Sequence, residues 1–160
     1  MSDSVTDAEF RQAMRAFASG VAIIACGRGE GRAGCVATAV ASLSLSPPSL
    51  IVNLQRDGST YRRLSELRRF SVNFLSRAQE SLARRFAGGA LASERFAQGA
   101  WIDGASGVPV LADALASLEA EVEEIVERHT HGIVIGRVGA AHTGPDEPPL
   151  LHFRGRFSGG

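Results

Sequence analysis

The first hydrophobic pattern along the chain is that of a short amphipathic helix. Thr6 and Glu9 have the spacing of a capping box, in which two side chains satisfy backbone amides of the first helical turn. The apolar residues that follow recur at helical spacing: Phe10, Met14 and Phe17. Gly20 interrupts this pattern, so we predict a helix that starts after Thr6 and ends before Gly20.

The next apolar segments predict a β-hairpin. Val21 to Cys26 is short and rich in β-branched side chains, Gly27 to Gly31 favours a turn, and Ala33 to Leu45 is apolar again. The two prolines of the sequence Ser46-Pro47-Pro48 end this run, because proline has no amide hydrogen to donate to a strand ladder. Leu50 to Leu54 then predicts another strand.

Short helices and strands follow in the middle of the chain. Ser59 can cap a helix that extends to about Arg68, and Phe70 to Leu75 predicts the next strand. A second short helix is expected from about Arg77 to Phe86. The irregular stretch around Trp101 and Pro109 predicts a surface excursion.

The segment Leu115 to Val126 carries two patterns at once. Its apolar residues fit a helix, yet its glutamates also alternate with apolar residues as in a strand, and propensity alone favours the helix. Ile133 to Val138 and Leu150 to Phe153 are clearer strands, on either side of the turn-rich loop Gly144 to Pro149. Hairpin-linked strands with few helices favour a mainly β fold, a β-barrel with short helices in one domain over residues 1–160.

The amino-acid composition limits the classes of partner that we expect for this protein. Seventeen Lys plus Arg residues balance seventeen Asp plus Glu residues, so nothing favours a nucleic acid partner. The sequence contains no apolar run long enough for a membrane span, and we expect no membrane association. Two cysteines, Cys26 and Cys35, are too few for a disulfide scaffold and are expected to be buried small side chains. We therefore expect a cytoplasmic protein.

Three glycines form a possible dinucleotide-binding motif. Gly29, Gly31 and Gly34 have the spacing G-x-G-x-x-G directly after a predicted strand. A Rossmann fold also needs a helix that opens at the motif and an acidic residue about twenty positions further on, where this chain has Asn53 and Leu54. We favour a glycine-rich hairpin turn, and a Rossmann nucleotide-binding domain stays as an alternative.

A series of motifs resembles the short-chain flavin reductase family, which contains the reductase components of two-component flavin monooxygenases. The segment 38–48 (TAVASLSLSPP) resembles the signature of that family. Further similar segments occur in the same order, at 50–60 (LIVNLQRDGST), 70–75 (FSVNFL), 82–87 (LARRFA), 131–138 (HGIVIGRV) and 149–157 (PLLHFRGRF). The resemblance extends over residues 8–157.

This resemblance implies an FMN-binding split barrel that forms a homodimer, with one flavin per subunit at or near the subunit interface. It also implies that Leu115 to Val126 is a strand, since sheet context can override a weak helical propensity. The implied activity is that of an NAD(P)H:flavin oxidoreductase, which supplies reduced FMN or FAD to a partner flavin-dependent monooxygenase. The sequence does not distinguish FMN from FAD, or NADH from NADPH.

The resemblance also implies a set of flavin contacts. The isoalloxazine ring and ribityl chain are placed on a small-residue segment that lets the ring approach the backbone: Thr38, Ala39, Val40, Ser42 and Ser44. Asn53 is a further expected contact. Hydroxyls, an arginine and a helix N-terminus suit the phosphate: Gln55, Arg56, Ser59 and Thr60. A second group of candidate phosphate or adenine contacts is Arg85, Phe86 and Ala87.

His131 is the expected catalytic residue. Hydride transfer needs the two reacting rings to be held in contact, so catalysis is expected to be mostly positioning. The family resemblance places four residues near the nicotinamide: His131, Phe153, Arg154 and Phe157. His129 and His131 could lie on one face of a strand and bind a metal ion, but no further ligand completes that set, so no metal is predicted. A structural role for His131 is a further alternative.

Two other interpretations remain. A protein of the same fold could bind flavin or haem without reducing it. The acidic run Glu119 to Glu127 is interpreted as a solvated face rather than a pair of catalytic carboxylates.

Overall fold

A computed structural model describes residues 4–89 and 91–159, so residues 1–3, 90 and 160 of the predicted domain lie outside the described residues. The described helices are α1 Asp7–Met14, η1 Gly29–Gly31, α2 Ser59–Leu67, η2 Arg77–Gln79, α3 Glu80–Ala87 and α4 Ala92–Arg95. The described strands are β1 Ser19–Gly20, β2 Ala22–Cys26, β3 Ala33–Ala37, β4 Val40–Leu45, β5 Pro48–Gln55, β6 Arg69–Phe74, β7 Trp101–Asp103, β8 Pro109–Leu111, β9 Ala116–Arg128, β10 His131–Thr143, β11 Leu150–Phe153 and β12 Arg156–Gly159.

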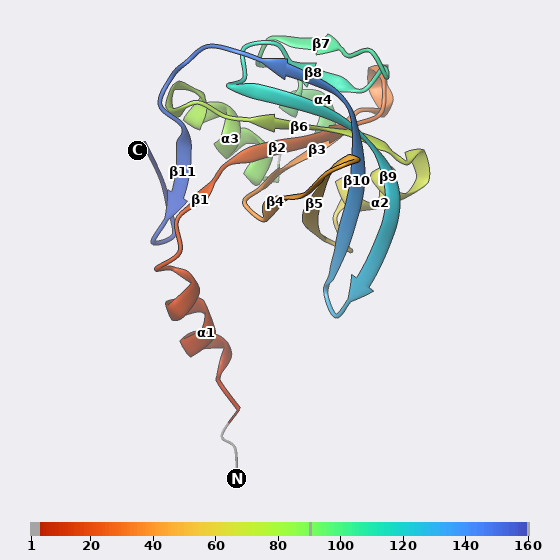
Figure 1. The fold of residues 1–160 in the computed structure, drawn as a ribbon. Helices are drawn as coiled ribbons and strands as arrows, with labels where there is room; N and C mark the ends of the chain where they lie inside the picture. The colour runs from red at the N-terminus through yellow and green to blue at the C-terminus, as the bar shows by residue number, and fades with distance from the viewer. Residues whose placement is uncertain (1–3, 90, 160) are drawn as a thin grey trace.

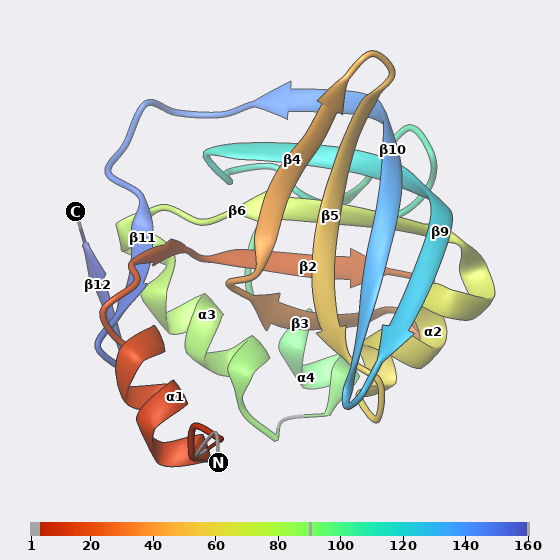
Figure 2. The same cartoon turned by 60° about the horizontal axis from the view of Figure 1, so that its bottom comes forward.

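Over the described residues, the strands form three sheets. Seven strands make the main sheet in the order β3-β2-β6-β9-β10-β5-β4, and β1-β11-β12 and β7-β8 make two smaller ones. The main sheet curls, so that β4 and β5 cross over β2 and β3 (Figure 2). The prediction of a mainly β fold with short helices is confirmed.

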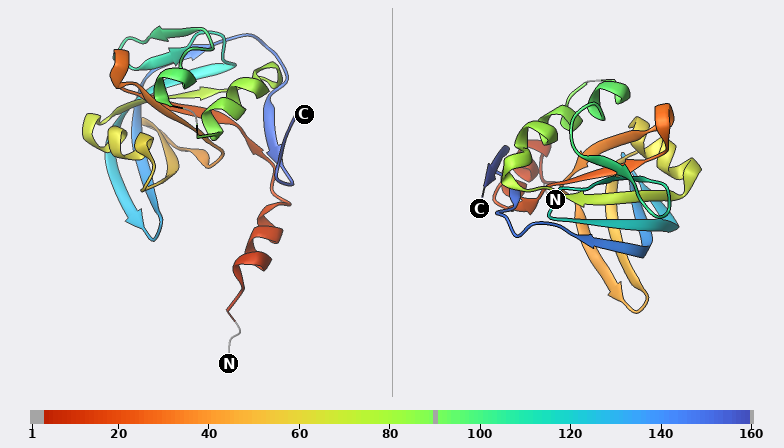
Figure 3. Two further views of the ribbon diagram at one scale, coloured as in Figure 1. Left: turned by 180° about the vertical axis from the view of Figure 1, so that it is seen from behind. Right: turned by 90° about the horizontal axis from the view of Figure 1, so that it is seen from above.

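Strand β2 is buried on both of its faces. Ile24 and Cys26 point into a core enclosed by the curled sheet, where they pack with residues of β5, β6 and β10. Ile23 and Ala25 point the other way, toward α3 and β8. Figure 3 shows α3 and α4 on this outer side of the sheet. Burial on both faces explains why β2 is a continuous apolar run rather than an alternating one.

The predicted hairpin of β2 and β3 is confirmed, with Ala22 opposite Ala37 and Cys26 opposite Ala33. The predicted single strand over 33–45 is wrong, because the chain leaves β3 at Thr38 and begins β4 at Val40. The glycine motif contributes the turn between β2 and β3, and β3 follows it where a Rossmann fold needs a helix. The Rossmann alternative is therefore excluded.

The ambiguous segment 115–126 is a strand, as the resemblance implied and against its helical propensity. It lies within β9, which pairs with β6 on one side and with β10 on the other. The solvated-face interpretation is wrong for one of its glutamates, since Glu119 is only 2% exposed and its carboxylate accepts hydrogen bonds from the loop at Ala105 and Ser106. Glu121, Glu123, Glu124 and Glu127 are exposed.

The stretch around Trp101 and Pro109 is not simply a surface excursion, because it packs against the main sheet. Val108, Val110 and Leu111 are buried, and β8 lies against β6. The backbone amide of Leu111 donates to Oδ1 of the buried Asn73 at 2.8 Å, which anchors the segment. Short strands β7 and β8 pair within it.

The N-terminal helix is confirmed, including its capping box between Thr6 and Glu9. It ends at Met14, earlier than predicted, and none of its residues is buried. Figure 1 shows α1 projecting away from the sheets beside β1. The helix after Gln55 is also confirmed as α2, but its N-cap is Gly58 rather than Ser59.

Candidate functional site

An open cleft of about 510 Å³ lies where β3, β5, α2, α3 and the start of β10 meet. A cleft of this size is in the range of small-molecule and cofactor sites. Nine of the predicted site residues line it: Thr38, Ala39, Asn53, Gln55, Ser59, Thr60, Phe86, Ala87 and His131. Residues from five separate segments of the chain are thus brought together in one cleft.

Strand register positions the floor of the cleft. In the pairing of β5 with β10, Gln55 lies opposite His131, so the end of β5 and the start of β10 face the same cleft. The two residues that link β3 to β4, Thr38 and Ala39, lie beside β5, because the amide of Asn53 donates to the carbonyl of Ala39 at 3.0 Å. The small residues Thr38 and Ala39 therefore form an accessible backbone segment beside β5, and they line the same cleft as His131.

Helix α2 presents its N-terminus to the cleft. Gly58, Ser59 and Thr60 all line it, and the first amides of a helix carry partial positive charge. The pKa of the neighbouring Cys35 thiol is raised by burial, while a hydrogen bond with Thr60 and the charge of Arg95 act in the opposite direction. Cys35, Thr60 and Arg95 all line the cleft.

The end of α3 forms another wall of the cleft, and an aromatic cluster packs behind it. Phe86 packs edge-on against Phe96, with ring centroids 5.1 Å apart, and both rings contact Trp101. A side chain at Gly34 would come within 2.8 Å of Phe86 and 3.1 Å of Phe96. The last glycine of the G-x-G-x-x-G sequence is thus required for aromatic packing behind the cleft.

Arg95 is a lining residue that the sequence reasoning missed. Its guanidinium donates to the carbonyl of Gly34 at 2.8 Å and to the carbonyl of Gly88 at 3.0 Å. No motif surrounds it in the sequence, so only the packing of α4 against β3 and α3 reveals it.

Two predicted phosphate contacts, Arg56 and Arg85, do not line the cleft. Arg56 forms an ion pair with Glu127 at 2.7 Å and donates to the carbonyl of His129 at 3.2 Å. Arg85 donates to Gln98 and to the carbonyl of Glu94.

The tip of the β9–β10 hairpin is fastened beside the cleft. The hydroxyl of Tyr61 donates to Glu127 at 2.9 Å, and Glu127 also holds Arg56. Gly132 lies directly against the Tyr61 ring, where a Cβ would be only 2.3 Å from a ring carbon. These contacts fix the position of His131 relative to the end of β5.

The remaining predicted contacts lie elsewhere. Three of them lie on β4, the edge strand next to the cleft, but none lines the cleft: Val40, Ser42 and Ser44. Phe153, Arg154 and Phe157 belong to the β11–β12 hairpin and its turn. There, Phe157 lies under the Arg84 guanidinium of α3, 5.4 Å from the ring centroid, and does not line the cleft.

The metal alternative for His129 and His131 is not supported. His129 lies in the turn between β9 and β10 with a positive φ of 50°, not on a strand face with His131. Within residues 4–89 and 91–159, no group of three or more His, Cys, Asp or Glu side chains is arranged to hold a metal ion. The Nδ1 of His131 is 2.8 Å from the hydroxyl of Thr130.

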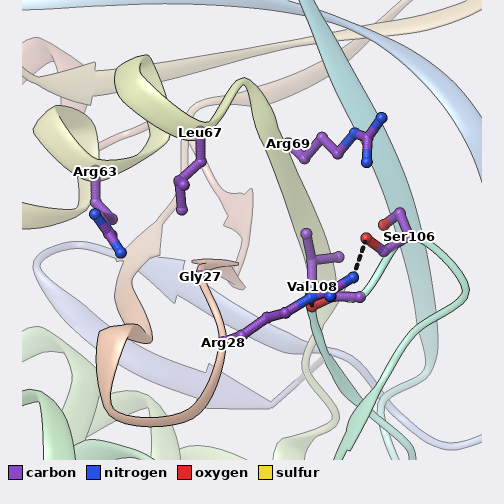
Figure 4. A pocket seen from close by; sticks show the side chains of 8 residues that line it. Gly27, Arg28, Arg63, Leu67, Arg69, Ser106 and Val108 are labelled. Carbon is purple, nitrogen blue, oxygen red and sulfur yellow. Dashed lines mark hydrogen bonds between the residues drawn. The ribbon is translucent and has the colours of Figure 1, made fainter.

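A second hollow of about 370 Å³ contains none of the predicted site residues. Figure 4 shows Arg28, Arg63 and Arg69 around it, with Arg28 bonded to the carbonyl of Ser106. Its walls come from the β2–β3 turn, α2 and the loop before β8.

In the part of the chain that the structure describes, no helix is both long and apolar enough to cross a membrane.

The residues that line the cleft suit an elongated, partly aromatic anion. The cleft combines an accessible backbone segment, a helix N-terminus, one arginine and a histidine, but no acidic side chain. Such a donor set suits a flat heterocycle with a phosphate tail, because backbone amides can bond the ring edge and cations can bond the phosphate.

Comparisons with known proteins agree with this description. Residues 14–160 match the family described as flavin reductase like domain. The chain is 38% identical over 149 residues to FMN reductase (NADH) RutF 2 of Rhizobium rhizogenes, covering 93% of this chain and 86% of that protein. The chain therefore belongs to the flavin reductase like family, and the resemblance of its motifs is confirmed.

Solved structures show the same fold. The NADH:FAD oxidoreductase SgcE6 of Streptomyces globisporus, in complex with NAD and FAD fragments, superposes with a TM-score of 0.89 at 31% identity, covering 99% of this chain and 94% of that one. BorF, the flavin reductase component of a bacterial two-component tryptophan halogenase, gives a TM-score of 0.89 at 27% identity, covering 96% and 98%.

Proposed function

We propose that this chain is an NAD(P)H:flavin oxidoreductase that reduces FMN or FAD in the cleft at His131. The observation that carries this proposal is the meeting of Thr38, Ala39, Thr60 and His131 in one cleft of a flavin reductase like fold. The names of the relatives, FMN reductase (NADH) and NADH:FAD oxidoreductase, support flavin and NADH as the reactants.

In this proposal the small residues at Thr38 and Ala39 allow the flavin ring to approach the backbone, together with Asn53. Gln55, Ser59 and Thr60 hold the phosphate at the start of α2. A bound flavin supplies the redox chemistry, accepting a hydride from the nicotinamide. His131 lies at the cleft edge on a fastened hairpin, so its role is to orient the nicotinamide rather than to transfer the hydride.

The fold is proposed to act as a split-barrel homodimer over residues 1–160. Apolar side chains that a single chain leaves exposed support this: Val5, Phe10, Met14 and Phe17 near the N-terminus, and Leu43 and Leu45 on the edge strand β4. In a dimer that covers β4, residues Val40, Ser42 and Ser44 would join the flavin site at the interface. Phe153, Arg154 and Phe157 are proposed to contact the nicotinamide nucleotide there.

The reduced flavin is proposed to leave for a flavin-dependent monooxygenase. The cleft is open, and BorF is the reductase component of a two-component system. Free cysteines at Cys26 and Cys35 are consistent with the reducing environment of the cytoplasm, where we place the protein.

The test is NADH oxidation by the purified protein, followed at 340 nm with and without added FMN or FAD. We expect turnover only when flavin is present, and loss of most turnover in His131→Ala with flavin binding retained. Tight flavin binding without any NADH oxidation would instead identify a non-catalytic flavin-binding protein. Retention of neither flavin, with no turnover, would contradict the proposal.

A further inference from the structure

A bound phosphate in the cleft needs a positively charged side chain that is free to face it. Of the 17 residues that line the cleft, Arg95 is the one arginine or lysine, and none is acidic. A phosphate there would therefore meet a single strong cation, whose charge no lining carboxylate neutralises.

The other nearby arginines are already engaged. Arg56 is paired with Glu127 and bonded to the His129 carbonyl at the hairpin tip. Arg85 is bonded to Gln98 and to the Glu94 carbonyl. Neither side chain lines the cleft, so moving either one into it would break these contacts.

Arg95 is held in place and still has donors to offer. Its Nη1 and Nη2 each donate to one carbonyl, of Gly34 and Gly88, which fixes the guanidinium between β3 and the end of α3. A guanidinium has five N–H groups, so two on its terminal nitrogens remain beyond these bonds. Its Nε is buried without a hydrogen-bond partner among the described residues. Over the same residues, no ion pair involves Arg95.

Arg95 and the start of α2 line the same cleft, and both contact β3. Arg95 donates to the carbonyl of Gly34 on β3, α2 packs against the same strand, and Thr60 lines the cleft with Arg95. A fixed cation and a helix N-terminus are thus available to the same cleft. Together they provide bidentate and backbone donors of the kind that recognise a phosphate monoester.

We propose that Arg95, not Arg56 or Arg85, is the side chain that recognises the phosphate of the bound flavin and so makes the cleft select a phosphorylated flavin over riboflavin. This proposal rests on the proposed function. It assigns a specificity role to a residue of α4, which no motif in the sequence marks.

The experiment compares FMN with riboflavin, which has the same ring and ribityl chain but no phosphate. Dissociation constants are measured by flavin fluorescence for the full chain and for Arg95→Gln. A hydrogen bond to a charged group is worth a factor of about 10 to 100 in affinity, so FMN should bind about 10- to 100-fold more weakly to the variant. Riboflavin affinity should be unchanged, because its contacts do not include Arg95.

Two further variants separate phosphate recognition from other effects. Arg62→Gln removes the same charge from an exposed position on α2 and should leave both affinities within about twofold. Arg56→Gln tests the competing residue and should change FMN and riboflavin affinity by the same factor. If Arg95→Gln does not fold, Arg95→Lys keeps the charge without the planar fork and should weaken FMN alone, by about 3- to 10-fold.

Equal losses for FMN and riboflavin in the Arg95 variants would show that Arg95 only supports the cleft wall. Unchanged FMN affinity in Arg95→Gln, or an FMN-selective loss in Arg56→Gln, would also overturn the proposal. If the unmodified chain binds neither flavin, the proposed function itself fails, which is a different result from any of these.

Discussion

Strand β2 and helix α1 are close in sequence, yet the apolar side chains of β2 are buried and those of α1 are exposed. Ile23 and Ile24 of β2 are fully buried on the two faces of the sheet. Phe10 of α1 is 58% exposed, and Phe17, just after the helix, is 65% exposed. Both elements follow their predicted hydrophobic patterns, but in a single chain only one of them has a surface to pack against.

This difference shows that the hydrophobic pattern of a segment predicts whether it forms a helix or a strand. Whether its apolar side chains are buried depends on which other elements the fold places beside it. Helix α1 gains its local stability from the capping box between Thr6 and Glu9. An isolated eight-residue helix is marginal in water, so α1 needs packing that the described chain does not provide. A second copy covering α1 would remove this difference.

The largest effect is expected in the doubly covered strand. Ile24→Ala should lower the free energy of unfolding by about 2–5 kcal/mol, because it leaves a cavity in a core that cannot close around it. Urea unfolding followed by circular dichroism measures this. A loss below about 1 kcal/mol would show that the core under β2 relaxes, and would weaken the contrast with α1.

The next largest effect on stability is expected at Glu119, a buried charged side chain on β9, and it depends on pH. Burial disfavours the Glu119 carboxylate, but bonds from Ser106, His142 and Ala105 outweigh it and lower its pKa to about 2. A pKa depressed in the folded state means stability that is full above the unfolded pKa near 4.5 and is lost as pH falls toward 2. This shift corresponds to about 3 kcal/mol.

Glu119→Gln should therefore reduce the free energy of unfolding at pH 6 by about 3 kcal/mol and at pH 3 by less than half as much. Glu121→Gln, at an exposed position of the same strand, is the matched control and should have little effect at either pH. Equal losses at both pH values would mean that the charge of Glu119 is not what holds the 104–108 loop.

A smaller effect is expected at the hairpin tip beside the cleft. The ion pair of Arg56 with Glu127 is about half exposed, so it should contribute only about 0.2–1 kcal/mol. A double-mutant cycle with Arg56→Gln and Glu127→Gln measures this coupling from unfolding free energies. A coupling above about 2 kcal/mol would mean that the tip is more deeply buried than the single chain shows, as it would be under a partner subunit.

The smallest effect on the single chain is expected in α1. Phe10→Ser should change the unfolding free energy of dilute, monomeric protein by less than about 0.5 kcal/mol, as for other exposed positions. The same change should weaken self-association, which sedimentation velocity measures over a range of concentrations. Ala13→Ser, on the same helix, serves as the control. An unfolding loss of 2 kcal/mol in the monomer would show that α1 packs on its own chain.

Local pattern predicted much of the fold. The β2–β3 hairpin, α2, α3 and β11 follow from turn residues and periodicity within the segments themselves. Pattern failed where distant partners decide the structure. Segment 115–126 is a strand because β6 and β10 flank it on both sides. The stretch near Trp101 is packed because the Trp101 ring meets Phe86 of α3 and Phe96, just after α4, and because Leu111 is bonded to the distant Asn73 of β6.

The residues of the candidate site also fall into those that could be predicted from the sequence and those that could not. Gln55 and His131 were assigned to the site through the family resemblance of their segments, and the register of β5 with β10 is what brings them together. Arg56 could not be placed, since its neighbour in space is Glu127, 71 positions away in the sequence. Arg95 was missed for a related reason, because its carbonyl partners Gly34 and Gly88 leave no trace in the residue types around it.

Helix α3 is a common wall between two parts of the molecule. Phe86 and Ala87 face the cleft, while Arg84 lies over Phe157 of the C-terminal hairpin. The β11–β12 hairpin and the cleft therefore contact one and the same eight-residue helix.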